Sequence, residues 1–274
     1  MDTTEITKDT TLCISLAARP SSIGTRFHNH LYSQLGLDYV YKAFTTTDLA
    51  SAIAGIRALG IRGCGVSMPF KEEVIALVDS LDASAQAISS VNTIVNTDGH
   101  LRAYNTDYLA VAGLLRDREV PPQSRFAVLG SGGMARAVVA ALRDSGFTKG
   151  AIVARNRDAG SALAAEYGFD WQPTIGDLRP DLIVNATPVG MAGGPDADAL
   201  PVPGEVVDSA STVFEVVANP AETPLVRRAR TSGAAVITGT EVLALQAVEQ
   251  FTLYTGVRPT AEQFALATAF SRAG

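Results

Sequence analysis

Short apolar segments alternate with helical segments along most of this chain, and this alternation restricts the possible folds more than any other feature. Strand-like segments at 11–18, 39–44 and 61–68 are followed by helical patterns at 27–37, 47–60 and 71–81. The alternation resumes at 125–146 and continues through 150–168, 181–190 and 211–217. Strands separated by helices of this length usually pair in parallel, so the sequence predicts an α/β protein with mostly parallel sheets.

Two features divide this alternation into two parts. Asp98-Gly99 lies between two short strand-like segments within 91–105 and predicts a β-hairpin. The stretch PPQS at 121–124 is the clearest linker signal, and helical patterns at 240–256 and 261–270 close the chain. With 274 residues and about 100–200 residues per domain, the sequence predicts two α/β domains.

Composition and charge exclude several classes of protein. A net charge of −6 argues against nucleic acid or an anionic membrane as a partner, because either would require clustered lysine and arginine. The start, MDTTEITKDT, is polar and unlike a signal peptide, and no apolar stretch reaches the ~20 residues needed to span a bilayer. Cys13 and Cys64 fall in different predicted strands, and the three histidines are scattered. We therefore expect a cytoplasmic protein without disulfides or a metal site.

A glycine-rich stretch, AVLGSGGMARA at 127–137, has the G-x-G-x-x-A spacing of a dinucleotide-binding turn. Gly130 would permit a tight turn after a strand, and Gly132 would let backbone N–H groups approach a pyrophosphate at a helix N-terminus. The alternative is an ordinary strand-to-helix turn. The predicted contacts of this loop with the cofactor are Gly130, Ser131, Gly132, Gly133, Met134 and Ala135.

The tip of the next predicted strand favours NADP over NAD. NAD sites place an acidic residue there to bind the ribose 2′-hydroxyl, whereas this tip carries Arg155, Asn156 and Arg157. Guanidinium groups match phosphate oxygens and can stack on adenine. The alternative is that these arginines are ordinary surface residues. Asn185 and Thr187, in the loop at 184–191, are expected near the nicotinamide half of the cofactor, although their spacing also suits a turn.

Polar stretches in the first half suggest a second site. RPSSIGTR, VSMPFK, SVNT and YNTDY are each predicted to follow a strand or hairpin, and ligands bind at the carboxyl edge of such sheets. Lys71, two asparagines and Asp107 converging there would suit a polyhydroxylated acid. Taken alone, Lys71 is more simply a solvated residue at a helix start.

These stretches carry a family resemblance that extends nearly from end to end. The segments PFKEE, SVNTIV, NTD, GSGGMARA, NAT, NPAETPL and LQAVEQFTLYTG resemble the shikimate dehydrogenase family, with most likeness to its shikimate dehydrogenase-like branch. The resemblance implies an α/β substrate domain with a mostly parallel sheet at 1–107 plus 241–274. It also implies a Rossmann-type domain at 108–240 and a role in aromatic amino acid biosynthesis. The family oxidises a ring alcohol with NADP, or with NAD in quinate-type members.

The resemblance also implies roles for individual residues. Lys71 corresponds to the catalytic lysine and Asp107 to its partner, while Asn92 and Asp107 correspond to residues that bind ring hydroxyls. Gln246 contributes from the C-terminal helix, and Arg155 matches the arginine that binds the adenosine phosphate. Ser22 and Ser67 complete the predicted substrate site, and Gly239 completes the predicted cofactor site.

The chain departs from the family pattern around the substrate. The family's Ser-x-Ser carboxylate motif reads Ser22-Ile23-Gly24 here, and Thr25 replaces a proline. Gly65 stands where the family has an asparagine, and Ala218 where it has a tyrosine. Losing a hydrogen bond to a charged group costs about 1.5–3 kcal/mol, so we expect weakened shikimate binding. Other residues of interest are Arg19, Ser21, Thr25 and Arg26, which could hold the carboxylate instead, and Tyr108, which could narrow the pocket or simply pack.

Three hypotheses remain open. The first is an NADP-dependent dehydrogenase of shikimate or a closely related cyclic hydroxy acid, in which Lys71 and Asp107 transfer the proton. The second keeps the chemistry but changes the substrate to quinate or another hydroxy acid. The third is an NADP-binding sensor without catalysis, which would have no need of a proton-transfer pair. The expected partner is a small molecule, and the chain is expected to be a monomer or homodimer.

Overall fold

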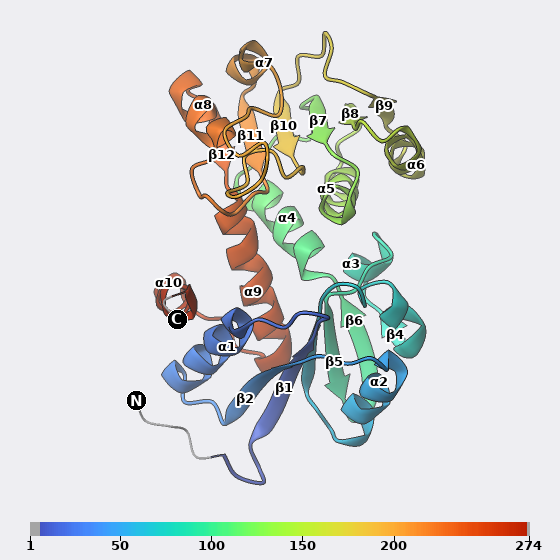
Figure 1. The fold of residues 1–274 in the computed structure, drawn as a ribbon, viewed down its shortest axis with the longest axis vertical. Helices are drawn as coiled ribbons and strands as arrows, with labels where there is room; N and C mark the ends of the chain where they lie inside the picture. The colour runs from blue at the N-terminus through green and yellow to red at the C-terminus, as the bar shows by residue number, and fades with distance from the viewer. Residues whose placement is uncertain (1–5, 273–274) are drawn as a thin grey trace. The chain divides into compact units, whose positions relative to one another are not determined.

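The computed structural model describes residues 6–272 and forms two compact units (Figure 1). The first unit comprises the chain up to Thr106 together with the part from Gln246 onward, and the second comprises Asp107–Leu245. The chain therefore crosses between the units twice. Assigning substrate binding to one unit and cofactor binding to the other remains a prediction.

Within the described residues, the first unit contains a six-stranded sheet of order β2-β1-β3-β5-β6-β4. β1 pairs in parallel with β2 and β3, and β4 pairs in parallel with β6, whereas β5 runs antiparallel to β3 and β6. The prediction of a mostly parallel sheet is confirmed. The strands are β1 (Thr11–Leu16), β2 (Tyr39–Phe44), β3 (Gly63–Val66), β4 (Ser80–Leu81), β5 (Thr93–Thr97) and β6 (His100–Tyr104).

The predicted hairpin joins β5 to β6. Asp98 and Gly99 have φ values of 51° and 85°, and this left-handed pair matches the twist of the two flanking strands. The hairpin reverses the chain direction, which is why β5 is the antiparallel member of the sheet.

Two of the predicted helices differ from their expected form. α1 begins at Ser22 rather than at residue 27, and Arg26 near its start donates hydrogen bonds to the backbone oxygen of Phe270 in α10. The helix expected at 71–81 is a short 3₁₀ segment, η1, followed by β4, which pairs with β6. The helical elements of this unit are α1 (Ser22–Gln34), α2 (Leu49–Ala58), η1 (Glu73–Leu77), α3 (Ala83–Gln86), α9 (Gly239–Thr255, shared with the second unit) and α10 (Ala261–Arg272).

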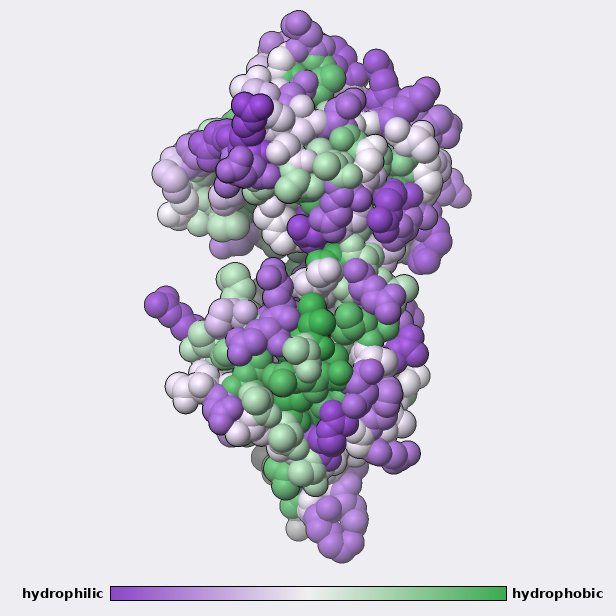
Figure 2. Space-filling model, turned by 90° about the vertical axis from the view of Figure 1, so that its right-hand side faces the viewer, coloured by the Kyte–Doolittle hydropathy of each residue, from purple (hydrophilic) through white to green (hydrophobic). Residues whose placement is uncertain are grey.

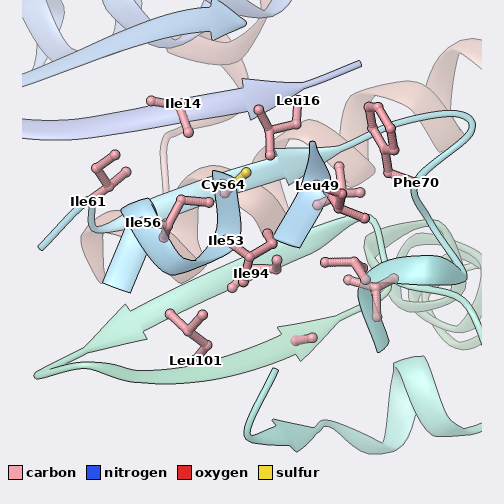
Figure 3. Packing of buried hydrophobic residues seen from close by; sticks show 14 of the residues in the cluster. Ile14, Leu16, Leu49, Ile53, Ile56, Ile61, Cys64, Phe70, Ile94 and Leu101 are labelled. Atoms are coloured by element: carbon pink, nitrogen blue, oxygen red, sulfur yellow. The ribbon is translucent and has the colours of Figure 1, made fainter. Parts of the chain in front are cut away.

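The sheet of the first unit is covered on both faces. Ile14 of β1 packs with α2 and η1 in one cluster of buried residues, whereas its neighbour Cys13 packs with α1, α9 and α10 in another. This alternation follows from the period of two in a strand. Figure 3 shows the first cluster, in which Phe70 lies with Leu16 and Leu49.

The second unit has the strand order of a doubly wound dinucleotide-binding fold. Within the described residues its sheet has six strands in the order β12-β11-β10-β7-β8-β9, and all of its pairings are parallel. The strands are β7 (Phe126–Leu129), β8 (Gly150–Val153), β9 (Asp170–Gln172), β10 (Leu182–Asn185), β11 (Thr212–Glu215) and β12 (Ala235–Ile237). The helices are α4 (Thr106–Asp117), α5 (Gly133–Asp144), α6 (Arg157–Tyr167), α7 (Gly204–Ser209) and α8 (Pro224–Ser232). The strand order reverses between β7 and β10, where such folds bind ligands, and the predicted Rossmann-type fold is confirmed.

The surface of the first unit has an apolar region. Figure 2 shows apolar residues gathered on one of its faces. Ile75, Leu77, Val78 and Leu81 are only partly buried where they pack against the α2 side of the core. Among the described residues, no helix combines the length and the apolar character needed to cross a membrane.

Candidate active site

Predicted substrate residues of the first unit lie at one edge of its sheet, and Asp107, where the second unit begins, comes three residues after a strand that ends at this edge. Lys71 follows the end of β3, and Asp107 follows the end of β6. The SVNT stretch was expected to follow a strand, but Asn92 instead precedes β5. Because β5 runs antiparallel to its neighbours, its start lies at the same edge as the ends of β3 and β6. The expected convergence therefore depends on the hairpin.

Lys71 lies in a turn that is anchored on both sides. Phe70 is 8% exposed and packs into the α2-side core (Figure 3). The backbone oxygen of Lys71 accepts a 2.8 Å hydrogen bond from the amide of Val91. Burying a phenylalanine side chain contributes about 1.5–3 kcal/mol, so the backbone that carries the lysine is held firmly.

Asn92 is 3% exposed, and its side chain is held from one end. Its Oδ1 accepts hydrogen bonds from the backbone amide of Thr106 (2.8 Å), the hydroxyl of Thr106 (3.2 Å) and the hydroxyl of Thr93 (3.0 Å). Its buried Nδ2 has no hydrogen-bond partner among the described residues. A buried amide donor of this kind is costly unless a ligand accepts from it.

Asp107 follows directly after Thr106 in the first turn of α4 and is 8% exposed. The bond between Asn92 and Thr106 therefore fixes the chain one residue before the predicted proton-transfer partner. A carboxylate in the first turn of a helix is favoured by the helix dipole. Asn105 supports the same turn, because its side-chain Nδ2 donates to the backbone oxygen of Ser90 and its backbone N–H donates to Ser84 Oγ.

The start of α1 does not match the expected loop of carboxylate ligands. Ser22 and Thr25 lie in the first turn of the helix, and Arg26 is engaged with Phe270, with its guanidinium 4.6 Å from the ring centre. Arg26 is therefore a poor candidate for holding a substrate carboxylate. Ser21 is extended at the N-cap and makes no side-chain cap bond, so its hydroxyl, the exposed Ser22 and the helix N–H groups are donors at this helix start.

Gly65 faces a crowded polar interior. A Cβ atom at this position would lie 2.9 Å from Tyr41 Oη and 3.3 Å from Gln250 Nε2. Tyr41 is buried and stacks on His28 at a centroid distance of 4.4 Å. The space in which the family's asparagine would begin is thus taken by Tyr41 and Gln250.

We expect Gly65→Ala to lower the free energy of unfolding by about 1–3 kcal/mol, because overpacking a filled interior forces side chains off their rotamers. Gly55→Ala is the matched control, since its Cβ meets nothing within 4 Å in α2. Alanine is favoured over glycine in a helix by about 1 kcal/mol. Denaturant titration of both variants measures the difference. Equal stability of the two variants would contradict the predicted crowding.

The glycine-rich turn of the second unit fits a dinucleotide phosphate group. Gly130 has φ of 108°, and a Cβ there would lie 2.9 Å from the backbone oxygen of Ala186. Gly132 caps α5, and Cβ atoms on Gly132 and Gly133 would meet nothing within 4 Å. The turn is therefore tight on the side of β10 and open at the helix N-terminus, where a pyrophosphate binds in such folds. Ser131 and Met134 lie beside these glycines, and Ala135 is fully buried.

The tip of β8 separates the two predicted arginines. Arg155 is exposed at the end of the strand, and Asn156 caps α6 by accepting from the amide of Ala159 at 3.1 Å. Arg157 lies 5.9 Å from the centre of the Trp171 ring. Arg155 is thus the better placed of the two for a 2′-phosphate.

Asn185 organises a buried network at the end of β10. Its Oδ1 accepts from the amide and the hydroxyl of Thr187, and its Nδ2 donates to the backbone of Val189 and to Glu215 Oε1. Glu215 also accepts from Thr223 Oγ1 at 2.9 Å. Because the polar atoms of the Asn185 side chain are engaged in this way, they hold the loop after β10 and are not free to contact a nicotinamide directly.

Sequence reasoning missed Glu215. It is fully buried at the end of β11, and burial raises the pKa of Glu215 to about 7, although hydrogen bonds from Val217, Thr223 and Asn185 act to lower it. Its position at the end of a predicted strand was the available signal, and that strand, β11, lies two strands from β7 and the glycine-rich turn. Gly239 is explained by packing, since a Cβ there would lie 2.3 Å from the backbone oxygen of Val217.

The fold and the glycine-rich turn together define a two-unit α/β protein whose second unit is of the dinucleotide-binding class. Comparison with known proteins identifies the family. A family model described as the shikimate dehydrogenase substrate binding domain matches residues 20–94. A shikimate dehydrogenase-like protein of Haemophilus influenzae is 53% identical over 267 residues, covering 97% of this chain and 98% of that protein.

Solved structures agree with this relationship. The structure of a shikimate 5-dehydrogenase-like protein superposes on this chain with a TM-score of 0.97 at 52% identity, and the match covers 98% of this chain and 100% of the other. The structure of the Thermus thermophilus shikimate 5-dehydrogenase in complex with NADP(H) and shikimate gives a TM-score of 0.81 at 30% identity. This match covers 95% of this chain and 99% of the other. The chain belongs to the shikimate dehydrogenase family, as its motifs predicted.

Proposed function

We propose that this protein is an NADP-dependent oxidoreductase that reversibly converts the ring alcohol of shikimate, or of a closely related cyclic hydroxy acid, into a ketone. The observation that carries the proposal is the Asn92 carboxamide, whose oxygen is fully engaged and whose buried Nδ2 has no partner among the described residues. It is a donor held ready for a substrate oxygen, at the sheet edge that also carries Lys71 and Asp107. The relative of known structure that holds shikimate and NADP(H) supports the choice of ligands.

In the proposed mechanism, Asn92 Nδ2 donates to a ring hydroxyl and orients the substrate. Lys71 accepts the proton of the alcohol as the C–H bond breaks, and returns it in the reverse direction. The carboxylate of Asp107, the proposed partner of Lys71, binds a ring hydroxyl. A bound NADP⁺ would supply the hydride acceptor. The glycine-rich turn after β7 would hold its pyrophosphate, and Arg155 its 2′-phosphate.

The proposed substrate domain is 1–107 plus 241–274, and the proposed cofactor domain is 108–240. Gln246 would contribute from α9, while Ser67 and the start of α1 around Ser22 would meet the polar groups of the acid. Because Gly65 and Gly24 carry no polar side chain, we propose weaker shikimate binding than in relatives that keep the family's motif. We propose a cytoplasmic protein, monomeric or homodimeric.

Steady-state assays with shikimate, quinate and a linear hydroxy acid, each with NADP⁺ and with NAD⁺, test the proposal. Turnover of shikimate with NADP⁺ is the expected result. Faster turnover of quinate than of shikimate would indicate that the same dehydrogenase chemistry acts on quinate as the substrate. Tight NADP⁺ binding without turnover of any of these acids would instead favour a nucleotide sensor.

We expect Arg155→Ala to raise the KM for NADP⁺ about 10- to 100-fold, since a charge-assisted hydrogen bond to phosphate is worth about 1.5–3 kcal/mol. The KM for NAD⁺ should change little, because NAD⁺ lacks the 2′-phosphate. Arg157→Ala is the matched control, as that guanidinium lies by Trp171. An equal loss for both cofactors in Arg155→Ala would show that the arginine does not read the phosphate.

A further inference from the structure

A chain of hydrogen bonds leads from the buried interior of the first unit to Asn92. His28 Nε2 lies 3.2 Å from Gln250 Oε1, Gln250 Nε2 lies 3.0 Å from Thr93 Oγ1, and Thr93 Oγ1 lies 3.0 Å from Asn92 Oδ1. We call these four residues the amide relay. They come from α1, α9, β5 and the residue just before β5.

The direction of every bond in the amide relay follows from one backbone group. The amide of Thr106 can only donate, so the atom that it meets on Asn92 must be the oxygen. A carboxamide oxygen cannot donate, so Thr93 must give its single hydroxyl proton to Asn92. Thr93 Oγ1 must then accept from Gln250, which turns Nε2 of Gln250 toward Thr93 and Oε1 toward His28.

The last bond determines the tautomer of His28. Its Nε2 must carry a proton in order to donate to Gln250, so its Nδ1 is the unprotonated nitrogen of the neutral ring. His28 is 2% exposed, and burial lowers the pKa of its imidazole to about 4. The ring therefore stays neutral at physiological pH, and protonating Nδ1 in acid would still leave Nε2 as a donor.

Gly65 provides the space that Gln250 occupies. A Cβ on Gly65 would stand 3.3 Å from Gln250 Nε2, so a longer side chain at this position would displace the glutamine from Thr93. The glycine and the amide relay thus depend on each other. The need for this space explains why Gly65 stands where the family has an asparagine. This reason is independent of the hydrogen bonds that make up the amide relay.

We propose that His28, Gln250 and Thr93 are positioning residues that hold the Asn92 carboxamide with its NH₂ group toward the substrate. The site would then select a substrate that presents a hydrogen-bond acceptor at this point, either a hydroxyl or a carboxylate oxygen. The inference deepens the proposed function and rests on it. None of the three positioning residues needs to touch the substrate for the relay to act.

Thr93→Val and Thr93→Ser form the decisive pair, since valine keeps the shape and removes the hydroxyl while serine keeps the hydroxyl. We expect Thr93→Val to raise the KM for shikimate about 10-fold, the effect of losing roughly 1.4 kcal/mol of binding, with kcat and the KM for NADP⁺ little changed. Thr93→Ser should restore the wild-type KM. Gln250→Glu should behave like Thr93→Val, because a carboxylate can only accept and would draw the single Thr93 hydroxyl proton away from Asn92.

A second measurement needs no substrate. In the ligand-free protein, nuclear magnetic resonance should detect the Asn92 NH₂ group as one ordered pair of signals in the wild type and in Thr93→Ser. Thr93→Val and Gln250→Glu should broaden or split this pair, because only Thr106 then holds the carboxamide oxygen. If the wild type turns over no shikimate, the proposed function fails, and these signals alone decide whether the relay exists.

An unchanged KM for shikimate in both Thr93→Val and Gln250→Glu would overturn the proposal, whatever the spectra show. Unchanged Asn92 signals in both variants would overturn it equally. A rise in KM that Thr93→Ser fails to reverse would indicate a packing role for the threonine and would also contradict the relay. Gln250→Met is a second variant at this position in case Gln250→Glu does not fold. Methionine removes the polar atoms of the glutamine and keeps its side-chain length.

Discussion

Replacing Lys71 with methionine should lower kcat for shikimate oxidation by about 10²–10⁴-fold, the usual contribution of a positioned general base. Methionine keeps an unbranched side chain of similar length but cannot accept the proton of the alcohol. The KM for shikimate should change much less, because in the proposed site Asn92 and Asp107 bind the ring hydroxyls. Steady-state kinetics with NADP⁺ at saturating shikimate measures the effect.

Lys42→Met is the matched control for this experiment. Lys42 lies on β2 with its ammonium 4.7 Å from the centre of the Phe44 ring, and it is exposed. The same chemical change there should leave kcat within experimental error. If Lys71→Met retains wild-type kcat while the protein remains folded and binds NADP⁺, Lys71 is not the base and the proposed mechanism is wrong.

Replacing Glu215 with glutamine should remove a pH dependence of stability from the second unit. The pKa of Glu215 is raised by burial from 4.5 to about 7 in the folded protein. Between these pH values the unfolded chain has lost its proton while the folded chain keeps it, so the wild type loses stability as pH rises from about 4.5 to about 7. The expected loss is on the order of 3 kcal/mol, at about 1.4 kcal/mol per pH unit.

The quantity to measure is the free energy of unfolding of the wild type minus that of Glu215→Gln. It should fall as pH rises from about 5 to about 7 and level off above that range. Fluorescence of Trp171, the single tryptophan of the chain, reports on the second unit, since this residue lies in β9.

Subtraction of the variant is needed because His28 acts in the opposite sense. Burial lowers the pKa of His28 from 6.5 to about 4, so its contribution to stability is lost as pH falls through this range. The wild-type curve alone would combine the two effects. A difference that stays flat between pH 5 and pH 7 would mean that Glu215 is already ionised in the folded protein, and would contradict the raised pKa.

Local patterns in the chain predicted the fold closely. The alternation of strands and helices, the Asp98-Gly99 turn and the glycine spacing of 130–135 all act through nearby backbone geometry, and each appears in the structure as expected. The segment at 71–81 was less predictable. Its helical pattern gives way to η1 and β4 because Ser80 and Leu81 pair with β6, and pairing with a distant strand is not encoded in local periodicity.

The candidate site was predictable in its residue types but not in its supports. The motifs predict Lys71, Asn92 and Asp107, and the structure places Lys71 and Asn92 at one sheet edge of the first unit, with Asp107 three residues after the end of β6. The sequence suggests Arg26 as a carboxylate ligand, but its guanidinium donates to the backbone oxygen of Phe270, 244 positions away in the sequence. Glu215 carried no recognisable pattern, because the burial that shifts its pKa is assembled from several elements.

The sequence by itself determined the order of elements, the two-part organisation, the dinucleotide turn and the family. These properties arise from side-chain periodicity and turn chemistry, which act over a few residues. Only the tertiary structure decided which end of the Asn92 carboxamide is held and which is left for a ligand. The backbone amide of Thr106, 14 positions away, selects the oxygen end, and the bonds that support it join residues 157 and 222 positions apart. Hydrogen-bond direction is set only when distant donors and acceptors are brought into a shared, dry interior.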